Sequence, residues 1–153
     1  MENASKALIM AGGVLIGVLI ISLAVYLFID FGSTSAEINA RNAQLQLLEF
    51  NSKFTTYENY KDDNGNWKIT IYDIITLAGY AKENNEYYEA SDATKENYID
   101  VKIGNNSVLK ETETSLINKY VNQNNGALTK FSCSGTQYYD SGRIKSISFI
   151  PLK

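Results

Sequence analysis

The sequence has no histidine, one cysteine and one proline in 153 residues. Without histidine, neither a Ser-His-Asp triad nor a Cys-His pair can form, and the usual zinc ligand sets are excluded. The single thiol, Cys133, has no second cysteine with which to form an internal disulfide. We expect Cys133 to be a small core residue on a strand, and a reactive thiol is the less favoured alternative. The chain must therefore hold together by packing alone.

An excess of positive charge is also missing, because 14 Lys and Arg stand against 17 Asp and Glu. Nucleic-acid binding requires a basic surface that displaces counterions from phosphates, so we expect no nucleic-acid partner. No glycine-rich phosphate loop is present. The run from Asp62 to Asn66 lacks the final Glu of a calcium-binding loop, which favours a solvated turn. We expect no catalytic residue, metal, cofactor or small-molecule substrate, and hence no enzyme.

The segment from Ala7 to Ile29 is 23 residues long and carries no charge. At about 1.5 Å per residue it spans roughly 35 Å, which exceeds the hydrocarbon core of about 30 Å. A cleaved signal peptide is the alternative, with Ser33 to Ala36 as a weak cleavage site. The apolar part of a signal peptide is only about 7 to 15 residues long. The length therefore favours a permanent anchor surrounded by membrane lipid.

The charges that flank this segment predict its orientation. Lys6 precedes the segment, whereas Asp30 and Glu37 follow it. Positive charge is retained on the cytoplasmic side, so the N-terminus is expected in the cytoplasm. The remainder of the chain is then expected outside the cytoplasmic membrane, either as an anchored domain or within a cell-surface filament.

Three small residues, Gly13, Gly17 and Ala24, lie on nearly one face of the apolar helix at spacings of four and seven. Small residues at such spacing let two membrane helices approach closely. The alternative is ordinary composition, since glycine is frequent in membrane helices. We predict a homo-oligomer that forms through this face.

From Ile38 to Phe54 the apolar residues recur at spacings of three, four and seven, which predicts an amphipathic helix. Thr34 and Glu37 fit a capping box that would begin a new helix after a break at Gly32. Alternatively, the membrane helix simply runs on. The chain is thus expected to consist of a membrane anchor, an amphipathic helix and an extracytoplasmic α+β domain, at residues 1–31, 32–56 and 57–153.

The last of these parts alternates helical and strand patterns. We expect a helix from Thr70 to about Lys82, a strand over 98–103, a helix over about 113–123, and a hairpin of strands over 128–139 and 143–150. The hairpin register places Cys133 opposite Phe149 and Gly135 opposite Ile147. Phe131, Cys133, Ile147 and Phe149 then share one face. That face is expected to pack on the long helix, which gives an α+β fold with a small antiparallel sheet.

Eleven tyrosines are present, and four of them lie in segments that we expect to be exposed. Tyr87 and Tyr88 fall in a polar loop, and Tyr138 and Tyr139 fall near the hairpin tip. Tyrosine is favoured at protein contacts because its rigid ring buries a large area at low entropic cost. These four residues are therefore possible contact residues, and ordinary packing at the edge of the domain is the alternative.

An apolar helix that continues into an amphipathic one and is followed by a small sheet resembles type IV pilins and pseudopilins. The resemblance implies that the apolar half holds the subunit in the membrane and later forms the central helix bundle of a filament. A basic leader ending in Gly is not visible, and Ser5 stands at the position of the family's Glu. Residues 2–20 also resemble the start of uncharacterised single-pass proteins of Gram-positive gut bacteria.

These expectations combine into two hypotheses for the function. The first is a non-enzymatic, pilin-like structural subunit that assembles through its N-terminal helix into a surface filament or envelope complex. The second is a monomeric, membrane-anchored binding or accessory module whose tyrosines contact a partner.

Overall fold

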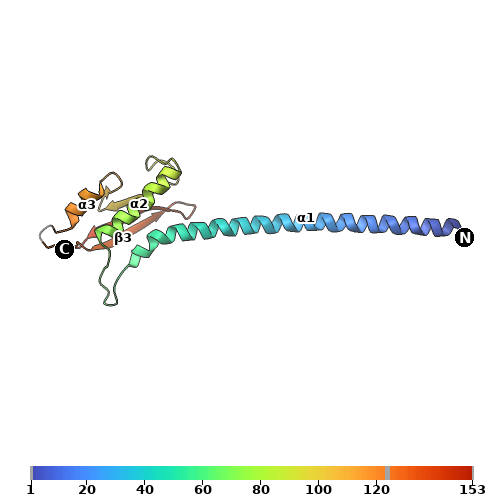
Figure 1. Ribbon diagram of the computed structural model, residues 1–153, viewed down its shortest axis with the longest axis horizontal. Coiled ribbons are helices and arrows are strands. Elements are labelled where there is room, and N and C mark those ends of the chain that lie inside the picture. The colour runs from blue at the N-terminus through green and yellow to red at the C-terminus, as the bar shows by residue number, and fades with distance from the viewer. Residues whose placement is uncertain (1, 123–124, 153) are drawn as a thin grey trace. The chain divides into compact units, whose positions relative to one another are not determined.

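The computed structural model describes residues 2–122 and 125–152 and divides the chain into two compact units (Figure 1). The first unit comprises Met1–Leu45 and the second Gln46–Lys153. Helix α1, Glu2–Thr55, forms the first unit, and its residues from Gln46 onward belong to the second. The helix continues through Gly32 without a break, as the second of the two alternatives expected. The three-part division at residues 31 and 56 stays a prediction.

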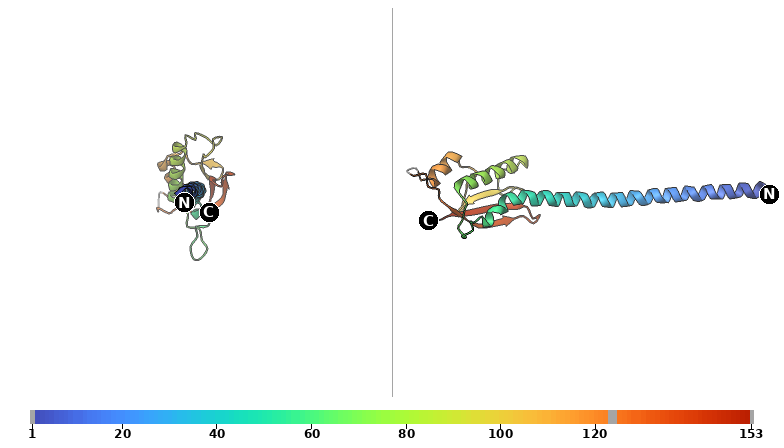
Figure 2. Two further views of the ribbon diagram at one scale, coloured as in Figure 1. Left: turned by 90° about the vertical axis from the view of Figure 1, so that its right-hand side faces the viewer. Right: turned by 60° about the horizontal axis from the view of Figure 1, so that its bottom comes forward.

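The second unit is an α+β domain, and its elements after α1 follow the order helix, strands, helix, strands. These are η1 (Thr56–Asn59), α2 (Ile71–Tyr87), β1 (Asp100–Ile103), β2 (Asn106–Ser107), α3 (Glu113–Tyr120), β3 (Phe131–Tyr138) and β4 (Ile144–Pro151). The four strands form one sheet in the order β2-β1-β4-β3 (Figure 2).

The sheet is mixed, so the expectation of a purely antiparallel sheet is wrong. β1 runs parallel to β4, whereas the pairs β1–β2 and β3–β4 are antiparallel. Parallel neighbours need a long crossover between them, and here the intervening chain contains β2, α3 and β3. The hairpin pattern predicts the β3–β4 pair but contains no signal for the strand on the other side of β4.

Helix α2 begins at the capping box that the sequence predicts. The Thr70 backbone N–H donates to Asp73 Oδ2 at 2.8 Å, and the reciprocal bond to the Thr70 side chain is also present. The helix extends beyond Lys82 to Tyr87, because the buried face continues through Ala81 and Asn84. The predicted helix is too short because Asn84 is buried but polar, so the apolar pattern does not continue to the end of the helix.

Two β-bulges alter the predicted register of the β3–β4 hairpin. Cys133 lies opposite Phe149 as expected, but Gly135 pairs with Ser148 and not with Ile147. Ser134 is the extra residue, and its hydroxyl donates to the Ser148 carbonyl at 3.0 Å. A second shift lies between Gln137 and Tyr138 and is followed by burial of both Ile144 and Ile147. Each bulge changes which side chains face the core.

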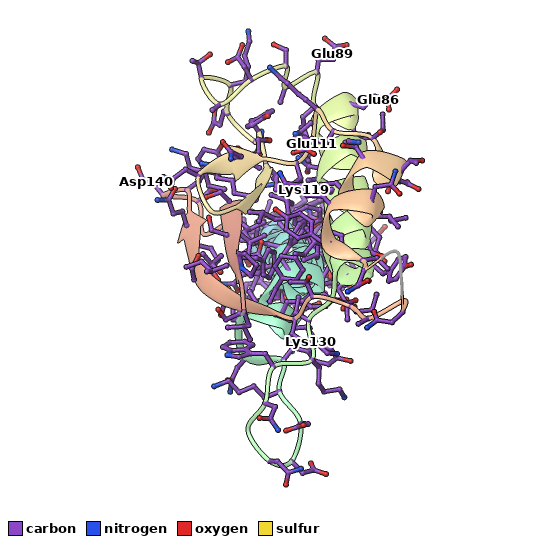
Figure 3. The ribbon with its side chains drawn as sticks, turned by 90° about the vertical axis from the view of Figure 1, so that its left-hand side faces the viewer. Glu86, Glu89, Glu111, Lys119, Lys130 and Asp140 are labelled. Carbon is purple, nitrogen blue, oxygen red and sulfur yellow. The ribbon has the colours of Figure 1, made fainter. Side chains whose placement is uncertain are left out.

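The core lies between the sheet and the helices of the second unit (Figure 3). Phe54 of α1 is fully buried in one cluster with Phe131 and Phe149. The predicted face of the hairpin therefore packs with the end of α1. Leu48, which the amphipathic pattern also predicted to pack inward, remains 62% exposed. Helix α2 supplies the remaining apolar layer through residues such as Ile74 and Leu77.

The fold predicts the cost of removing a core ring. We expect Phe149→Ala to lower the free energy of unfolding by about 3 to 5 kcal/mol, because the ring is lost and a cavity remains. Urea unfolding of the full chain in mild detergent, followed by fluorescence of the single tryptophan, Trp67, measures this change. Ile150→Ala removes a neighbouring side chain that is half exposed, so it should change the stability by less than about 1 kcal/mol. Equal effects of the two substitutions would contradict the assigned core face.

Candidate functional site

In the first unit, the small residues of α1 form an open face. A Cβ atom added at Gly13 or Gly17 would meet no atom within 4 Å. Ala24 lies about two turns beyond Gly17 and, with Leu27, Phe28 and Phe31, lines an apolar hollow. The structure thus brings the three predicted small residues onto one side of the helix without covering them.

Helix α1 is long and apolar enough to cross a membrane, and its most apolar stretch is not buried in the protein. A helix of this kind suggests membrane anchoring. A signal sequence near an N-terminus has the same length and composition, so the alternative raised by the sequence stays open.

In the second unit, the four candidate tyrosines do not form one surface. Tyr87 is the last residue of α2 and packs edge-to-face on Tyr88, with ring centroids 4.9 Å apart. Tyr87 is therefore helical and does not lie in the predicted loop, whereas Tyr88 lies in the turn that follows the helix. The Tyr138 hydroxyl donates to Glu58 Oε1 at 3.0 Å. The Tyr139 hydroxyl donates to the backbone carbonyl of Tyr98 at 2.6 Å. Tyr138 and Tyr139 thus make contacts within the domain, whereas Tyr87 and Tyr88 line a pocket.

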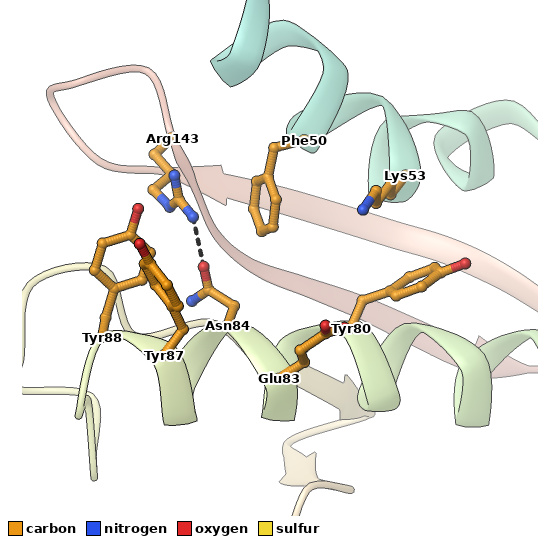
Figure 4. A pocket seen from close by; sticks show the side chains of 8 residues that line it. All are labelled: Phe50, Lys53, Tyr80, Glu83, Asn84, Tyr87, Tyr88 and Arg143. Atoms are coloured by element: carbon orange, nitrogen blue, oxygen red, sulfur yellow. Dashed lines mark hydrogen bonds between the residues drawn. The ribbon is translucent and has the colours of Figure 1, made fainter. Parts of the chain in front are cut away.

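This pocket has a volume of about 270 Å³ and lies within the second unit (Figure 4). The end of α1 supplies Phe50 and Lys53, and α2 supplies Tyr80, Glu83 and Asn84. Tyr87, Tyr88 and Arg143 complete the lining. Aromatic rings make up much of its wall, and two cations and one carboxylate are placed among them.

Arg143 is held in a fixed position at one side of the pocket. Its guanidinium lies 4.2 Å from the ring centroid of Phe50 and 4.9 Å from that of Tyr88. It donates a hydrogen bond from Nη2 to Asn84 Oδ1 (Figure 4). Asn84 is itself buried and donates from Nδ2 to the carbonyl of Asn97 at 2.7 Å. Stacking on aromatic faces and a buried amide therefore fix the orientation of the cation.

The positive charges of the pocket exceed its negative charge. The Lys53 ammonium lies 5.1 Å from the ring centroid of Tyr80. Among the described residues, neither Lys53 nor Arg143 forms a salt bridge with Glu83 or any other carboxylate. Arg143 Nε is buried and has no hydrogen-bond partner in the described part of the chain. The arrangement can therefore accept an anionic group.

Asn51 anchors the hairpin turn from which Arg143 extends. Its Nδ2 donates to the Gly142 carbonyl at 2.8 Å, and its Oδ1 accepts from the Ile144 N–H at 3.0 Å. Gly142 adopts a φ of 78°, which favours glycine. The end of α1 and the β3–β4 turn are thus joined on both sides of Arg143.

Cys133 and Asp62 both have structural roles, which agrees with the expectations of a core thiol and a solvated turn. Burial raises the pKa of the Cys133 thiol, which lies half-buried on β3 and packs against the core. This agrees with a structural residue, because a reactive thiol needs a lowered pKa. The hydrogen bond from the Asn66 backbone N–H lowers the pKa of the Asp62 carboxyl. That carboxylate holds its own turn, since it also accepts from the Asn64 N–H at 2.9 Å.

Comparisons of the chain with protein-family models, curated proteins and solved structures find no match. The resemblance to type IV pilins therefore stays a prediction from the sequence.

The sequence found two of the pocket residues, Tyr87 and Tyr88, and missed Phe50, Lys53 and Arg143. Phe50 reads as a core residue and Arg143 as a polar residue after a turn. Their common location depends on how α1 and the hairpin pack, and no local pattern reports that packing.

The role of Asn51 is testable. We expect Asn51→Ala to reduce the free energy of unfolding by about 2 to 4 kcal/mol, because a carbonyl and an N–H of the turn lose their partners. Ser52→Ala is the matched control. Ser52 is exposed and its hydroxyl bonds only to the Glu49 carbonyl one turn earlier, so its removal should cost less than about 1 kcal/mol. Urea unfolding curves of both variants make the comparison, and an unchanged midpoint for Asn51→Ala would refute the role.

Proposed function

We propose that this protein is a non-enzymatic structural subunit that assembles through α1, in the manner of a pilin, into a surface filament or envelope complex. The observation that carries the proposal is a heptad-spaced face along α1. Gly17, Ala24, Phe31, Ile38 and Leu45 follow one another at intervals of seven residues on an unbroken helix. A repeat of seven keeps one seam of a helix facing a partner helix.

The residue types on this face change with their surroundings. Gly17 and Ala24 lie within the charge-free segment. In lipid the hydrophobic effect does not favour helix association, whereas close packing of two backbones does. Phe31, Ile38 and Leu45 follow that segment and are 78%, 53% and 55% exposed. In water, burial of such large apolar side chains favours association. Both halves of the face therefore have the chemistry that a second copy of α1 would need.

The direction of insertion follows from the flanking charges. Lys6 precedes the span and Asp30 follows it, which supports a cytoplasmic N-terminus and a second unit outside the cytoplasmic membrane. Copies inserted in one direction lie parallel, so identical positions of the heptad face meet.

The alternative function is a monomeric, membrane-anchored binding or accessory module. The pocket of the second unit favours this alternative, since it is lined by Tyr87, Tyr88 and Arg143, and Arg143 forms no salt bridge among the described residues. A monomer needs only the apolar length of α1 and would not depend on its small residues.

Topology gives the first test of the proposal. Protease added to intact cells or protoplasts is expected to remove the chain from about Phe54 onward and to leave the charge-free span protected. Immunodetection of an N-terminal tag measures the protected fragment. Full protection in intact cells, with cleavage only after lysis, would reverse the orientation.

The small residues give the second test. Gly13→Ile and Gly17→Ile place a branched side chain where two backbones should meet, so crosslinked oligomers or filaments should be lost. Membrane insertion should persist, because the apolar character of the span rises slightly. Chemical crosslinking in native membranes and negative-stain microscopy provide the readouts.

Val14→Ile is the matched control, since it adds one methylene to a side chain that is already branched and should leave crosslinking unchanged. Equal crosslinking in all three variants would remove the support for a subunit. The anchored monomer would then be the better account.

A further inference from the structure

The pocket of the second unit contains a cation, Arg143, that forms no salt bridge with a carboxylate among the described residues. Arg143 is half-buried between two aromatic rings, its Nε is buried without a hydrogen bond, and no carboxylate among the described residues forms a salt bridge with it. A desolvated charge is costly unless it is paired. An anion supplied from outside the domain would provide that pair, and Lys53 lies on the same pocket to share it.

The size of the pocket limits what this anion can be. Its volume of about 270 Å³ lies below the usual range for cofactors and drug-sized ligands, which begins near 300 Å³. One amino-acid side chain fits such a space. Phe50, Tyr80 and Tyr88 line the pocket with rings, against which the stem of a side chain can pack. The chemical class that fits is an aspartate or glutamate carried on a polypeptide.

The second unit also carries a matching acidic projection, residues 61–66, which we name the finger. Figures 1 and 3 show that it extends away from the helices and the sheet. Lys61 bridges to Trp67 across its base, and the Asp62 N–H donates to the Asn66 carbonyl at 2.8 Å. The Gly65 N–H donates to the Asp62 carbonyl at 3.0 Å. The finger is therefore preorganised, so little ordering entropy is lost when it binds.

The tip of the finger presents one uncommitted carboxylate. Asp62 accepts hydrogen bonds from the N–H groups of Asn64 and Asn66 and is occupied in holding the turn. Asp63 is exposed and forms no salt bridge among the described residues. Asp63 is thus the side chain at the tip that is free to pair with a cation of another molecule.

We propose that the pocket receives Asp63 of the finger of a second copy of this chain, with Arg143 and Lys53 as its cationic partners. This inference rests on the proposed function, because it requires copies held side by side. Finger and pocket are different surfaces of one chain, so the contact is heterologous when each copy places its finger in the pocket of the next copy. Heterologous contacts repeat from copy to copy and build rings or open filaments.

The experiment uses the full chain in native membranes, with Cys133→Ser to remove the native thiol. Asn64→Cys on the finger and Tyr87→Cys at the pocket rim report the contact as a disulfide-linked dimer after mild oxidation. Into this protein we introduce Asp63→Lys, Lys53→Glu, or both. Each single change should lower the dimer yield about tenfold, because like charges then meet in the contact. The double change restores opposite charges between positions 63 and 53 but leaves Arg143 cationic, so it should recover part of the yield.

Two controls separate this contact from the assembly itself. Glu113→Cys on α3, used in place of Tyr87→Cys, should give no dimer. Phe31→Cys on the heptad face reports association of the helices in the same variants and should be unaffected by the charge changes. Two results would overturn the finger contact while helix dimers persist and the proposed function stays intact. One is an unchanged finger–pocket dimer yield in the single variants, and the other is a yield that does not rise again in the double variant. If the chain with the Phe31→Cys reporter and no charge change forms no helix dimers, both the finger contact and the proposed function are overturned.

Discussion

Helix α1 combines a stretch that is long and apolar enough to cross a membrane with an end that packs into the second unit, and the rest of the structure depends on this division. Over residues 7–29 it carries no charge, and its backbone polar groups are satisfied within the helix, as a hydrocarbon environment requires. From Gln46 onward the same helix supplies Phe54 to the core and Asn51 to the hairpin turn. No disulfide is possible within the chain, so the second unit depends on this packed end of α1.

Two buried amides connect the core to the pocket. Asn51 and Asn84 are 9% and 6% exposed, and both are hydrogen-bonded to backbone carbonyls. A leucine of similar size at either position would leave those backbone groups without partners, which costs more than the apolar contact contributes. The amides therefore fix one conformation of the turn and one orientation of Arg143. The interior of the domain therefore fixes how Arg143 is presented to the pocket.

Features that depend on neighbouring residues could be predicted from the sequence, and features that depend on distant residues could not. The Thr70 capping box, the hairpin and the Cys133–Phe149 pair follow from local spacing. The bulge at Ser134 does not, because the residues around Ser134 are of the same kinds as those in a regular strand. The parallel β1–β4 pair joins segments that are about 45 residues apart, and the pocket joins α1 to the hairpin. Such contacts are decided by the packing of whole elements, and local patterns in a single sequence do not predict that packing.

The two proposed contacts between copies rest on different physics and would divide the work of assembly. Helix packing in lipid uses dispersion and close backbone approach, which dissolved salt does not screen. A contact between Asp63 and the Arg143 side of the pocket is electrostatic, and at about 0.15 M salt exposed charges are screened beyond roughly 8 Å. The part of the helix face that lies in lipid can therefore bring copies together at any salt concentration. The finger then selects their relative orientation at short range, because a charge pair of this kind adds more to register than to affinity.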